Sequence, residues 1–579
     1  MEKMRKKKGD TGRAILFLAP ALLLICCFTV IPIFEAVYTS FHKTQYAMVG
    51  EFVGLKNYIS VMVESDGLKN IINSIVYVVL SLLLAMPIGI GVGTLLNRKI
   101  RGMTIFRTMI IIPWTLSQTV TALLWKWLLN GNYGLITSWA YQLTGKKMDL
   151  FSSAIIAKIL VVIVNVWNTV PVVIILTIAA LQTISPELIE AAQVDGASRK
   201  MIYWKLTLPM IRPTMVTALV MQSIEYFNMV TLIYVLTAGG PFNATQTLSL
   251  AAYQNGFDYW HMDIAAAYSI IIFLLNIVFI CLCKNPENQR QLGGETMGKR
   301  KSSLGKTPGL DFLTVIALIA AAIVSLFPVL WGLSTALKTD SAVTMFPPEI
   351  IPKEITWNNF IDVVTKSDFM LYMKNSLLIT LISIVMATFV AAHAAYALTF
   401  FNIRFRKGIS FFILMTSMVP PVALLVPLYM LSVKLNLYNT RILLVLIYTA
   451  WRTPILTWIM EGFFRKLPME IVEAGIIDGC SKSKAFYKLI LPISQPGIVS
   501  AALLSAVYVW NDYLVSSSFI TASEKKMISV GLYQYITQYG IKWGLLMAAV
   551  MISIIPIIIL FICMQKRFVE GMAAGAVKG

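Results

Sequence analysis

Charged side chains are scarce in this sequence. They make up 13% of its 579 residues, against about 25% in an average soluble domain. Hydrophobic residues make up 58%, against about 45–50% in soluble domains, and the mean hydropathy is +0.75. So few charges and so many apolar side chains exclude an ordinary soluble domain, and we expect the chain to lie in lipid.

Residues that form disulfides, bind metals or catalyse reactions are also few. The chain has three histidines and six cysteines, and the cysteines lie in apolar runs, at the ends of such runs or in one loop, without a spaced framework. No disulfide and no metal site is therefore predicted. A membrane-embedded transferase would require clustered acids or metal ligands near one membrane face, and the sequence has none. We predict no catalytic residue.

One stretch has the frame of a nucleotide-binding loop but lacks a residue that such a loop needs. Residues 293–299 give a glycine, four residues and Gly-Lys. Arg300 stands where Ser or Thr would hold magnesium, and no strand precedes the stretch. We expect no cofactor on this chain.

The chain has many apolar runs that are long enough to span a membrane. A helix needs about 20 apolar residues to cross the hydrocarbon core. Six runs fall in each half of the chain: Ala14–Tyr38, Ile71–Leu96, Ile105–Leu129, Ala154–Leu181, Leu206–Leu236 and Ile264–Cys283, then Leu313–Leu337, Ser376–Thr399, Ile409–Leu431, Ile442–Phe464, Ile493–Ser516 and Trp543–Gln565.

Basic residues are concentrated in alternate connections. The net charge is +20, and Lys and Arg gather before the first run and in the connections that contain Arg98, Arg199, Arg404 and Lys482. Cytoplasmic loops carry this excess in membrane proteins. The positive charge is therefore explained by topology, so we expect no nucleic-acid partner and place both termini in the cytoplasm.

Two short stretches repeat one pattern. Residues 185–196 read Ser-Pro-Glu-Leu-Ile-Glu-Ala-Ala-Gln-Val-Asp-Gly, and residues 467–479 end in Val-Glu-Ala-Gly-Ile-Ile-Asp-Gly. Glu190 and Glu473 are 283 positions apart, and so are Gly196 and Gly479. The chain is an internal duplication, and the even number of spans in each half makes it a parallel repeat.

Each stretch has the composition of a helix, a glycine hinge and a second helix. Ser185 can cap the first helix, and Pro186 stands where a missing N–H does no harm. Gly196 supplies a left-handed residue after the helix end, and Ser198 can cap the next helix. The small residues of so short a helix allow another surface to approach its backbone, which suits a docking element.

Glu-Ala-Ala, three residues, Gly, nine residues and then a hydrophobic residue, any residue and Leu-Pro resembles the EAA loop of bacterial ABC importer permeases. In that family the loop is a cytoplasmic coupling helix in a groove of the ATPase subunit. The alternative is a polar connector that merely joins two spans, but a matched pair at 186–209 and 468–492 favours the coupling loop. The resemblance assigns ATPase coupling to Glu190, Ala191, Ala192, Asp195, Gly196, Glu473, Ala474, Asp478 and Gly479.

Nearly the whole chain resembles a pair of such permeases in one polypeptide. Residues 1–284 resemble the larger permease of maltose-type sugar importers, and residues 311–579 resemble the smaller one, with residues 285–310 as a cytoplasmic linker. The resemblance implies an all-α polytopic membrane protein with the type I ABC importer permease fold, in the bacterial inner membrane. It implies two ABC ATPase subunits, which carry ATP and magnesium, and an extracytoplasmic sugar-binding protein as partners. The family usually keeps the two permeases separate, so the fusion, natural or engineered, is a departure.

Polar residues inside the apolar runs mark the predicted sugar path, because such residues usually face a bundle interior or a wet cavity. Gln222, Glu225 and Tyr226 lie three and four positions apart and share one helical face. The family places sugar contacts in this region, and helix-to-helix hydrogen bonding is the alternative. The predicted substrate-binding residues are Asn165, Trp167, Asn168, Gln222, Glu225, Tyr226 and Asn228.

Three other groups of residues carry predictions. We assign Arg452, Tyr508 and Asn511 in the second half to packing or gating. Gly89 and Gly93, four positions apart, predict close helix packing. The outer loop 522–540 resembles the segment that reaches into the binding protein in this family, with contacts predicted at Tyr533 and Tyr535, and an ordinary amphipathic connector is the alternative.

Together these features predict the translocation core of an ATP-driven, binding-protein-dependent sugar importer. An ion-coupled secondary transporter is the alternative, since it can also have two parallel six-helix repeats. It would need no cytosolic helical plug, and the chain offers few embedded acids for ion coupling, chiefly Glu225. Mono-, di- and oligosaccharides, sugar-like phosphodiesters and polyols all fit the predicted path.

Overall fold

The protein is described here from a computed structural model, which covers residues 2–64, 66–98, 100, 102–283, 308–537 and 540–576. Within these residues helices dominate, and the strands form two short antiparallel hairpins. These are β1 (His42–Gln45) with β2 (Met48–Phe52), and β3 (Ile536–Thr537) with β4 (Gly540–Ile541). Residues 285–307 of the predicted linker lie outside the described residues.

Eight helices in the described part of the chain are long and apolar enough to cross a membrane unbroken. The first runs over Gly12–Ser40, where a π-helical turn (Cys26–Val30) joins α1 (Glu2–Ile25) to α2 (Ile31–Ser40). The others are α4 (Gly67–Leu96), α8 (Ala154–Leu181), α14 (Met262–Cys283), α15 (Pro308–Ala336), α18 (Phe369–Phe400), α21 (Arg441–Phe464) and α28 (Trp543–Ala576).

The third and fifth predicted spans of each half are bent pairs of helices. In the third spans, α5 (Met103–Thr115) meets α6 (Gln118–Leu128) at 96°, and α19 (Arg406–Thr416) meets α20 (Pro421–Lys434) at 87°. In the fifth spans, Arg199–Phe227 meets α12 (Thr231–Thr237) at 49°, and Lys482–Ile493 meets α25 (Gln495–Asn511) at 77°. If each pair is one span, the total is twelve, as predicted.

Local sequence explains one of the breaks. The Ser117 hydroxyl accepts a hydrogen bond of 3.0 Å from the backbone N–H of Val120 and so caps α6. Leu116, just before it, has an extended backbone. The apolar run continues across this point, so hydropathy alone does not reveal the break.

Shorter helices fill the connections between the spans. They are α3 (Lys56–Ile59), α7 (Leu135–Thr144), α9 (Pro186–Val194), α10 (Arg199–Met201), α13 (Leu248–Tyr253), α16 (Asp340–Val343), α17 (Asn358–Thr365), α22 (Met469–Ile477), α23 (Lys482–Ala485), α24 (Leu491–Ile493), α26 (Leu514–Phe519) and α27 (Ile528–Tyr533); α11 (Leu208–Phe227) completes the fifth span.

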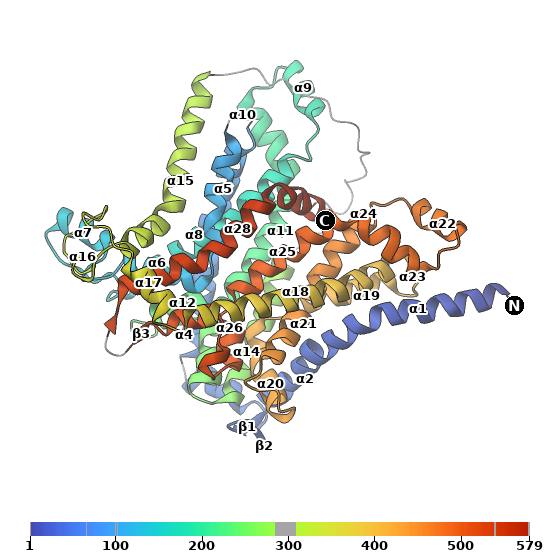
Figure 1. Ribbon diagram of the computed structural model, residues 1–579, viewed down its shortest axis with the longest axis horizontal. Coiled ribbons are helices and arrows are strands. Elements are labelled where there is room, and N and C mark those ends of the chain that lie inside the picture. The colour runs from blue at the N-terminus through green and yellow to red at the C-terminus, as the bar shows by residue number, and fades with distance from the viewer. Residues whose placement is uncertain are drawn as a thin grey trace.

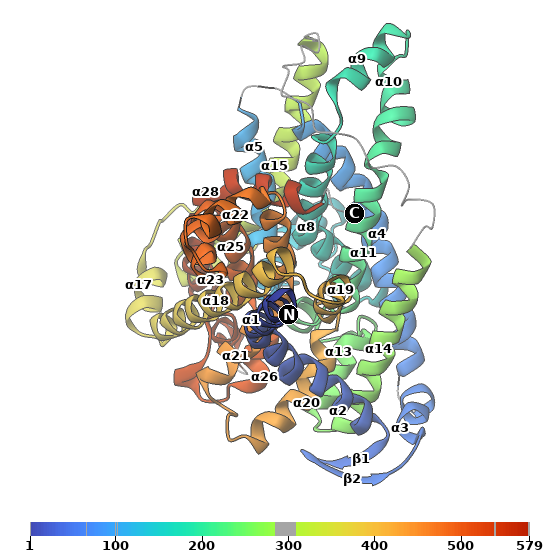
Figure 2. The same cartoon turned by 90° about the vertical axis from the view of Figure 1, so that its right-hand side faces the viewer.

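The first span of each half packs against the other half. In the views of Figures 1 and 2, α1 lies along α18 and α21, whereas α15 lies beside α5. The indole of Trp167 on α8 donates to the carbonyl of Val324 on α15 at 3.0 Å, and Trp127 on α6 donates to Thr335 on α15 at 2.8 Å. The two halves therefore interlock in a reciprocal, repeat-like way.

Close helix packing at Gly89 and Gly93 is confirmed. A Cβ atom added to Gly89 would lie 2.5 Å from Val173 of α8, and one added to Gly93 would lie 2.7 Å from Thr177 of the same helix. Glycine is therefore needed for α4 to approach α8 this closely.

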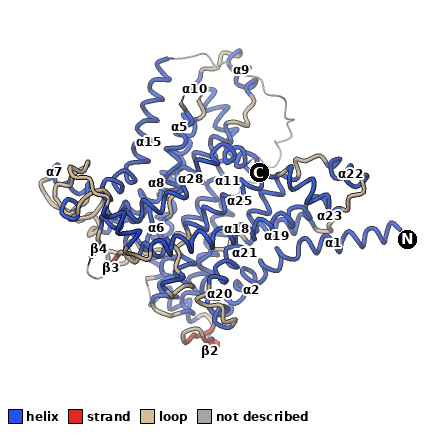
Figure 3. The backbone as a smooth tube through the Cα atoms, in the orientation of Figure 1, coloured by secondary structure: helices blue, strands red, loops and turns tan. Residues whose placement is uncertain are grey.

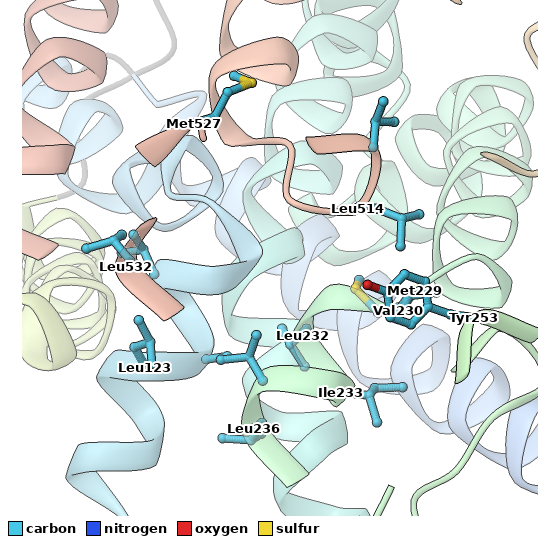
Figure 4. Close-up of a cluster of buried hydrophobic side chains, with 14 of the residues drawn as sticks. Leu123, Met229, Val230, Leu232, Ile233, Leu236, Tyr253, Leu514, Met527 and Leu532 are labelled. Atoms are coloured by element: carbon cyan, nitrogen blue, oxygen red, sulfur yellow. The ribbon is translucent and has the colours of Figure 1, made fainter. Parts of the chain in front are cut away.

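The two ends of the molecule differ in what they carry. In Figure 1, α9, α22 and the start of α1 lie at the top and right, and α7, α16 and the hairpins lie at the left and bottom. Figure 3 shows the strands at this second end and helices through the rest. Between the ends, buried apolar side chains from both halves pack together, among them Leu123 of α6, Ile233 of α12 and Leu532 of α27 (Figure 4).

Candidate coupling loops and substrate path

The first predicted coupling loop folds as a helix, a hinge and a second helix. Helix α9 has no buried residue, and its Pro186 occupies the first turn as predicted. The Ser185 hydroxyl bonds to the Glu187 carboxylate, so the predicted cap of a backbone N–H by Ser185 is wrong. Gly196 has a φ of +79°, in the left-handed region, as the hinge prediction requires.

The second loop forms the same hinge hydrogen bonds as the first loop. The N–H of Ala197 donates to the carbonyl of Ala192 at 3.0 Å, and the N–H of Cys480 donates to the carbonyl of Gly475 at 2.8 Å. Gly479 has a φ of +82°. These bonds close the end of each helix around a left-handed glycine.

The serine after each hinge caps the next helix. The Ser198 hydroxyl accepts from the N–H of Met201 at 3.3 Å, and the Ser481 hydroxyl accepts from the N–H of Lys484 at 3.2 Å. The predicted cap at Ser198 is confirmed.

Most of the predicted coupling residues are accessible. Glu190, Ala191, Asp195 and Gly196 are exposed, and Ala192 is half-buried. In the second loop Glu473, Ala474, Asp478 and Gly479 are exposed. Both loops therefore offer the motif to an outside partner, with α9 at the top and α22 at the right in Figure 1.

The second loop is packed more tightly onto its own half. Val472 and Gly475 are buried in α22, and a Cβ atom added to Gly475 would lie 2.5 Å from Leu489. The close approach of Leu489 accounts for glycine here, where the first loop has Ala192. Motif spacing alone does not reveal this difference.

The predicted sugar-path residues on α8 are buried and bonded to other protein groups. The amide of Asn165 donates to the Ser81 hydroxyl at 3.1 Å. The amide of Asn168 donates to the Pro113 carbonyl at 2.6 Å and to the Thr121 hydroxyl at 3.0 Å. Trp167 reaches α15, as described above. These are helix-packing bonds, and sugar contact by the three residues stays a prediction.

The predicted residues at the end of α11 differ in how deeply their side chains are buried. Gln222 is buried and donates to the Thr169 carbonyl at 3.1 Å, and the buried Tyr226 shares a hydrogen bond of 2.8 Å with the Thr169 hydroxyl. Asn228 is half-buried, and its amide donates to the Ile224 carbonyl at 2.7 Å. Glu225 is exposed. Glu225 is therefore the predicted path residue with the most open side chain.

The second half places a cation against an aromatic ring within its spans. The guanidinium of Arg452 on α21 lies 3.5 Å from the ring centroid of Tyr508 on α25. This ring contact fits the assignment of Arg452 and Tyr508 to packing or gating, which stays a prediction. An ionisable residue inside a span is also by default a candidate for a functional site.

The predicted binding-protein contacts lie at the opposite end from the loops. The Tyr533 ring lies 5.9 Å from that of Tyr234 and 6.0 Å from that of Tyr513, so it joins an aromatic cluster between the halves. The Tyr535 hydroxyl shares a hydrogen bond of 2.9 Å with Ser367, and burial raises the pKa of Tyr535. Contact with a binding protein stays a prediction for both.

No cluster of three His, Cys, Asp or Glu residues that could hold a metal ion occurs in the described part of the chain.

A family comparison identifies the two halves. Residues 85–285 and again residues 375–573 match the family described as binding-protein-dependent transport system inner membrane component. The two matches together span more than half of the chain.

Individual relatives match about half of the chain each. The sulfoquinovosyl glycerol transport permease of Agrobacterium fabrum is 32% identical over 284 residues, which cover 48% of this chain and 100% of the relative. The trehalose/maltose permease proteins MalG and MalF of Thermococcus litoralis are 33% and 30% identical, covering 46% and 48% of this chain and 96% and 93% of their own lengths. A crystal structure of a bacterial alginate importer has 21% identity and a TM-score of 0.42, over 46% of this chain and 99% of that chain.

A single relative is thus about as long as one half of this chain, and each half has its own match to the family. The chain belongs to the binding-protein-dependent transport system inner membrane components and carries two copies of that family's domain in one polypeptide.

Proposed function

We propose that this chain is the translocation core of an ATP-driven importer of carbohydrate, with an extracytoplasmic binding protein on one side and two ATPase subunits on the other. The observation that supports it best is the pair of exposed hinge loops, which repeat each other's hydrogen bonds and positive-φ glycines. The names of the relatives, which include trehalose/maltose permeases, support a carbohydrate substrate.

In this proposal α9 and α22 face the cytoplasm and each dock on one ATPase, which carries ATP and magnesium. Both termini are cytoplasmic, residues 1–284 and 311–579 are the two permease domains, and residues 285–310 link them. The hinge glycines let each short helix move with its ATPase. The spans of the other half follow this movement, because α1 and α15 interlock the two halves. The chain itself forms no covalent intermediate.

The test is uptake by proteoliposomes that contain the full chain, its host's ATPase and its binding protein. Glu190→Lys and Glu473→Lys place a positive charge on each exposed docking helix, so each should reduce ATPase co-purification and ATP-dependent uptake at least about tenfold. Glu354→Lys, an exposed charge reversal at the far end, is the control and should change neither. Uptake driven by an ion gradient without any ATPase would instead identify a secondary transporter.

A further inference from the structure

The segment that leads into the second span is tied down in the same way in both halves. Asn57 donates hydrogen bonds of 2.9 Å to the carbonyl of Ser40, the last residue of α2, and to the carbonyl two residues later. Asn359 donates bonds of 3.0 and 2.9 Å to the carbonyl of Ala336, the last residue of α15, and to the carbonyl two residues later. The two asparagines are therefore equivalent residues of the repeat, and each holds its segment to the end of the preceding span.

The two segments also bury and expose the same positions. Asn57 and Asn359 are 302 positions apart, and so are Val61 and Val363, which are fully buried. Apolar side chains that are 42% to 62% exposed stand at four pairs of positions with this spacing: Leu55 and Trp357, Ile59 and Ile361, Met62 and Val364, and Leu68 and Met370. Each segment therefore has a buried side and an open apolar side.

The open side forms a stripe along the segment. Leu55, Ile59 and Met62 are four and three residues apart, a spacing that places side chains on one side of a helical turn. The buried side packs against the sixth span of the same half, which is α14 for the first segment and α28 for the second. Contiguous apolar patches on a protein surface mark sites of interaction with a partner or a membrane.

Each stripe continues into the lipid-facing side of the next span. Leu68 and Ile72, at the start of α4, are 55% and 54% exposed, and Met370 and Leu377 of α18 are 46% and 59% exposed. Both helices are long and apolar enough to cross a membrane, so lipid covers their exposed apolar sides. The same lipid surface therefore extends over the stripe that precedes each helix.

Aromatic side chains gather beside the first segment. Phe34, Tyr38 and Phe52 line an open groove between α2 and the hairpin of β1 and β2. The ring of Phe41, which also lines this groove, lies 5.5 Å from the ring of Tyr58 in α3. Aromatic rings are enriched where a membrane meets water. The groove thus has the composition of a membrane interface.

We propose that residues 55–63 and 357–364 are two interfacial anchors, which lie in the outer headgroup layer of the bilayer and bind its phospholipids through their apolar stripes. Such a segment inserts its apolar side at the boundary between headgroups and acyl chains. Figure 2 shows α3 at the lower right and α17 (Asn358–Thr365) at the left, on opposite flanks of the molecule. Lipid on both flanks then fixes the depth of each half in the bilayer, whereas a binding protein seated between the halves would leave the flanks open.

Spin labelling measures the depth of the anchors. The full chain, with its native cysteines replaced by serine, is reconstituted in vesicles of phosphatidylethanolamine and phosphatidylglycerol, and a nitroxide is attached at Ile59→Cys or Ile361→Cys. Oxygen concentrates in lipid, and a nickel chelate stays in water. The ratio of oxygen to nickel collisions should be at least about threefold higher at both sites than at Lys146→Cys, an exposed polar position after α7. Leu377→Cys, within the span, should give a lipid value and confirms that the chain is inserted.

The exposed neighbours on the polar side serve as matched controls. Lys56→Cys and Asn358→Cys are equivalent positions next to the anchoring asparagines, and both should give ratios nearer to that of Lys146→Cys. Equal ratios at Ile361→Cys and Lys146→Cys overturn the proposal. Nickel access to Ile59→Cys or Ile361→Cys that falls only when the host's binding protein is added also overturns it, because the stripe is then a protein-docking surface.

The depth measurement involves no ATPase and no solute. If the anchors report lipid but ATP drives no uptake in the proteoliposome assay, the anchors stand and the proposed function fails. If uptake occurs but the anchors report water, the proposed function stands and the anchors fail.

Discussion

The side-chain amide of Asn511 donates a hydrogen bond of 2.9 Å to the backbone carbonyl of Thr115, in the other half of the molecule. Asn511 ends α25, and Thr115 ends α5 just before its bend. The two residues also line a very small pocket together with residues of α27 and α28. Two broken spans from different halves are therefore fastened where both helices end.

Asn511→Ala should weaken the contact between the halves. The variant leaves the Thr115 carbonyl without this donor and should lower the free energy of unfolding by about 1 kcal/mol. The matched control is Asn228→Ala, at the equivalent position, because the Asn228 amide bonds only within its own helix. Unfolding by detergent titration should show the larger loss for Asn511→Ala, and an equal loss in both variants would contradict the cross-half role.

Substitutions of the hinge glycines should destabilise the loops through backbone strain and not through steric crowding. Nothing lies within 4 Å of a Cβ added at Gly196 or Gly479, but both have positive φ. Alanine at either position should therefore cost about 1 kcal/mol of loop stability, and asparagine, which tolerates the left-handed region, should cost less. Hydrogen exchange of the Ala197 and Cys480 amides measures this directly. Faster exchange in the asparagine variants than in the alanine variants would contradict the strain argument.

The hinge loops could be predicted because their structure is local. The glycine that adopts positive φ, the serine that caps the next helix and the bonds between them lie within about seven residues, and both copies contain them. One local prediction still failed, because the Ser185 hydroxyl donates a hydrogen bond to the Glu187 carboxylate and does not accept one from a backbone N–H of the first turn.

The arrangement of the spans could not be predicted in the same way. Hydropathy shows that a run is apolar but not which helix it packs against. The packing of α1 and α15 against helices of the opposite half was therefore not predicted. The breaks at Leu116 and Val419 interrupt apolar runs without interrupting hydropathy. The hydrogen bond from Asn511 to Thr115 depends on how the halves meet, so the pattern within either half does not reveal it.

Lys338 should give the protein a pH-dependent stability. It follows α15, is 1% exposed and lies 4.2 Å from the ring centroid of Trp331, with its ammonium bonded to the Glu349 carbonyl. Burial lowers the pKa of Lys338 from 10.5 to about 8, against an opposing effect of the Glu349 carboxylate. The folded state then disfavours the proton relative to the unfolded state, so stability should rise as the pH increases from about 8 to about 10.

Replacing this lysine isolates the effect. Lys338→Met keeps an apolar stem and removes the titration, so wild type should gain stability relative to the variant between pH 7 and pH 10 in thermal unfolding. Lys146→Met, at an exposed side chain, should follow wild type at every pH. A constant difference between wild type and Lys338→Met would mean that the lysine does not titrate in this range.

Glu461 should anchor the bent third span next to the second coupling loop. Its carboxylate is 6% exposed, accepts a bond from Arg465, lies 3.9 Å from Arg406 and accepts bonds of 3.3 and 3.4 Å from Ser410. Arg406 and Ser410 belong to α19, whereas Glu461 is in the last turn of α21, so the carboxylate joins the two helices.

The first half has uncharged residues at the equivalent positions, and these residues suggest the substitutions that test the role of Glu461. Ile178 and Gln182 stand 283 residues before Glu461 and Arg465, and Ile178 is buried. Glu461→Ile should cost about 1–3 kcal/mol because it leaves Arg465 without its partner. Adding Arg465→Gln copies the first half and should restore part of that loss, since no unpaired guanidinium then follows the helix. Detergent-titration unfolding with Glu354→Gln as an exposed control measures both changes, and a double variant less stable than Glu461→Ile alone would show that the carboxylate is not the anchor.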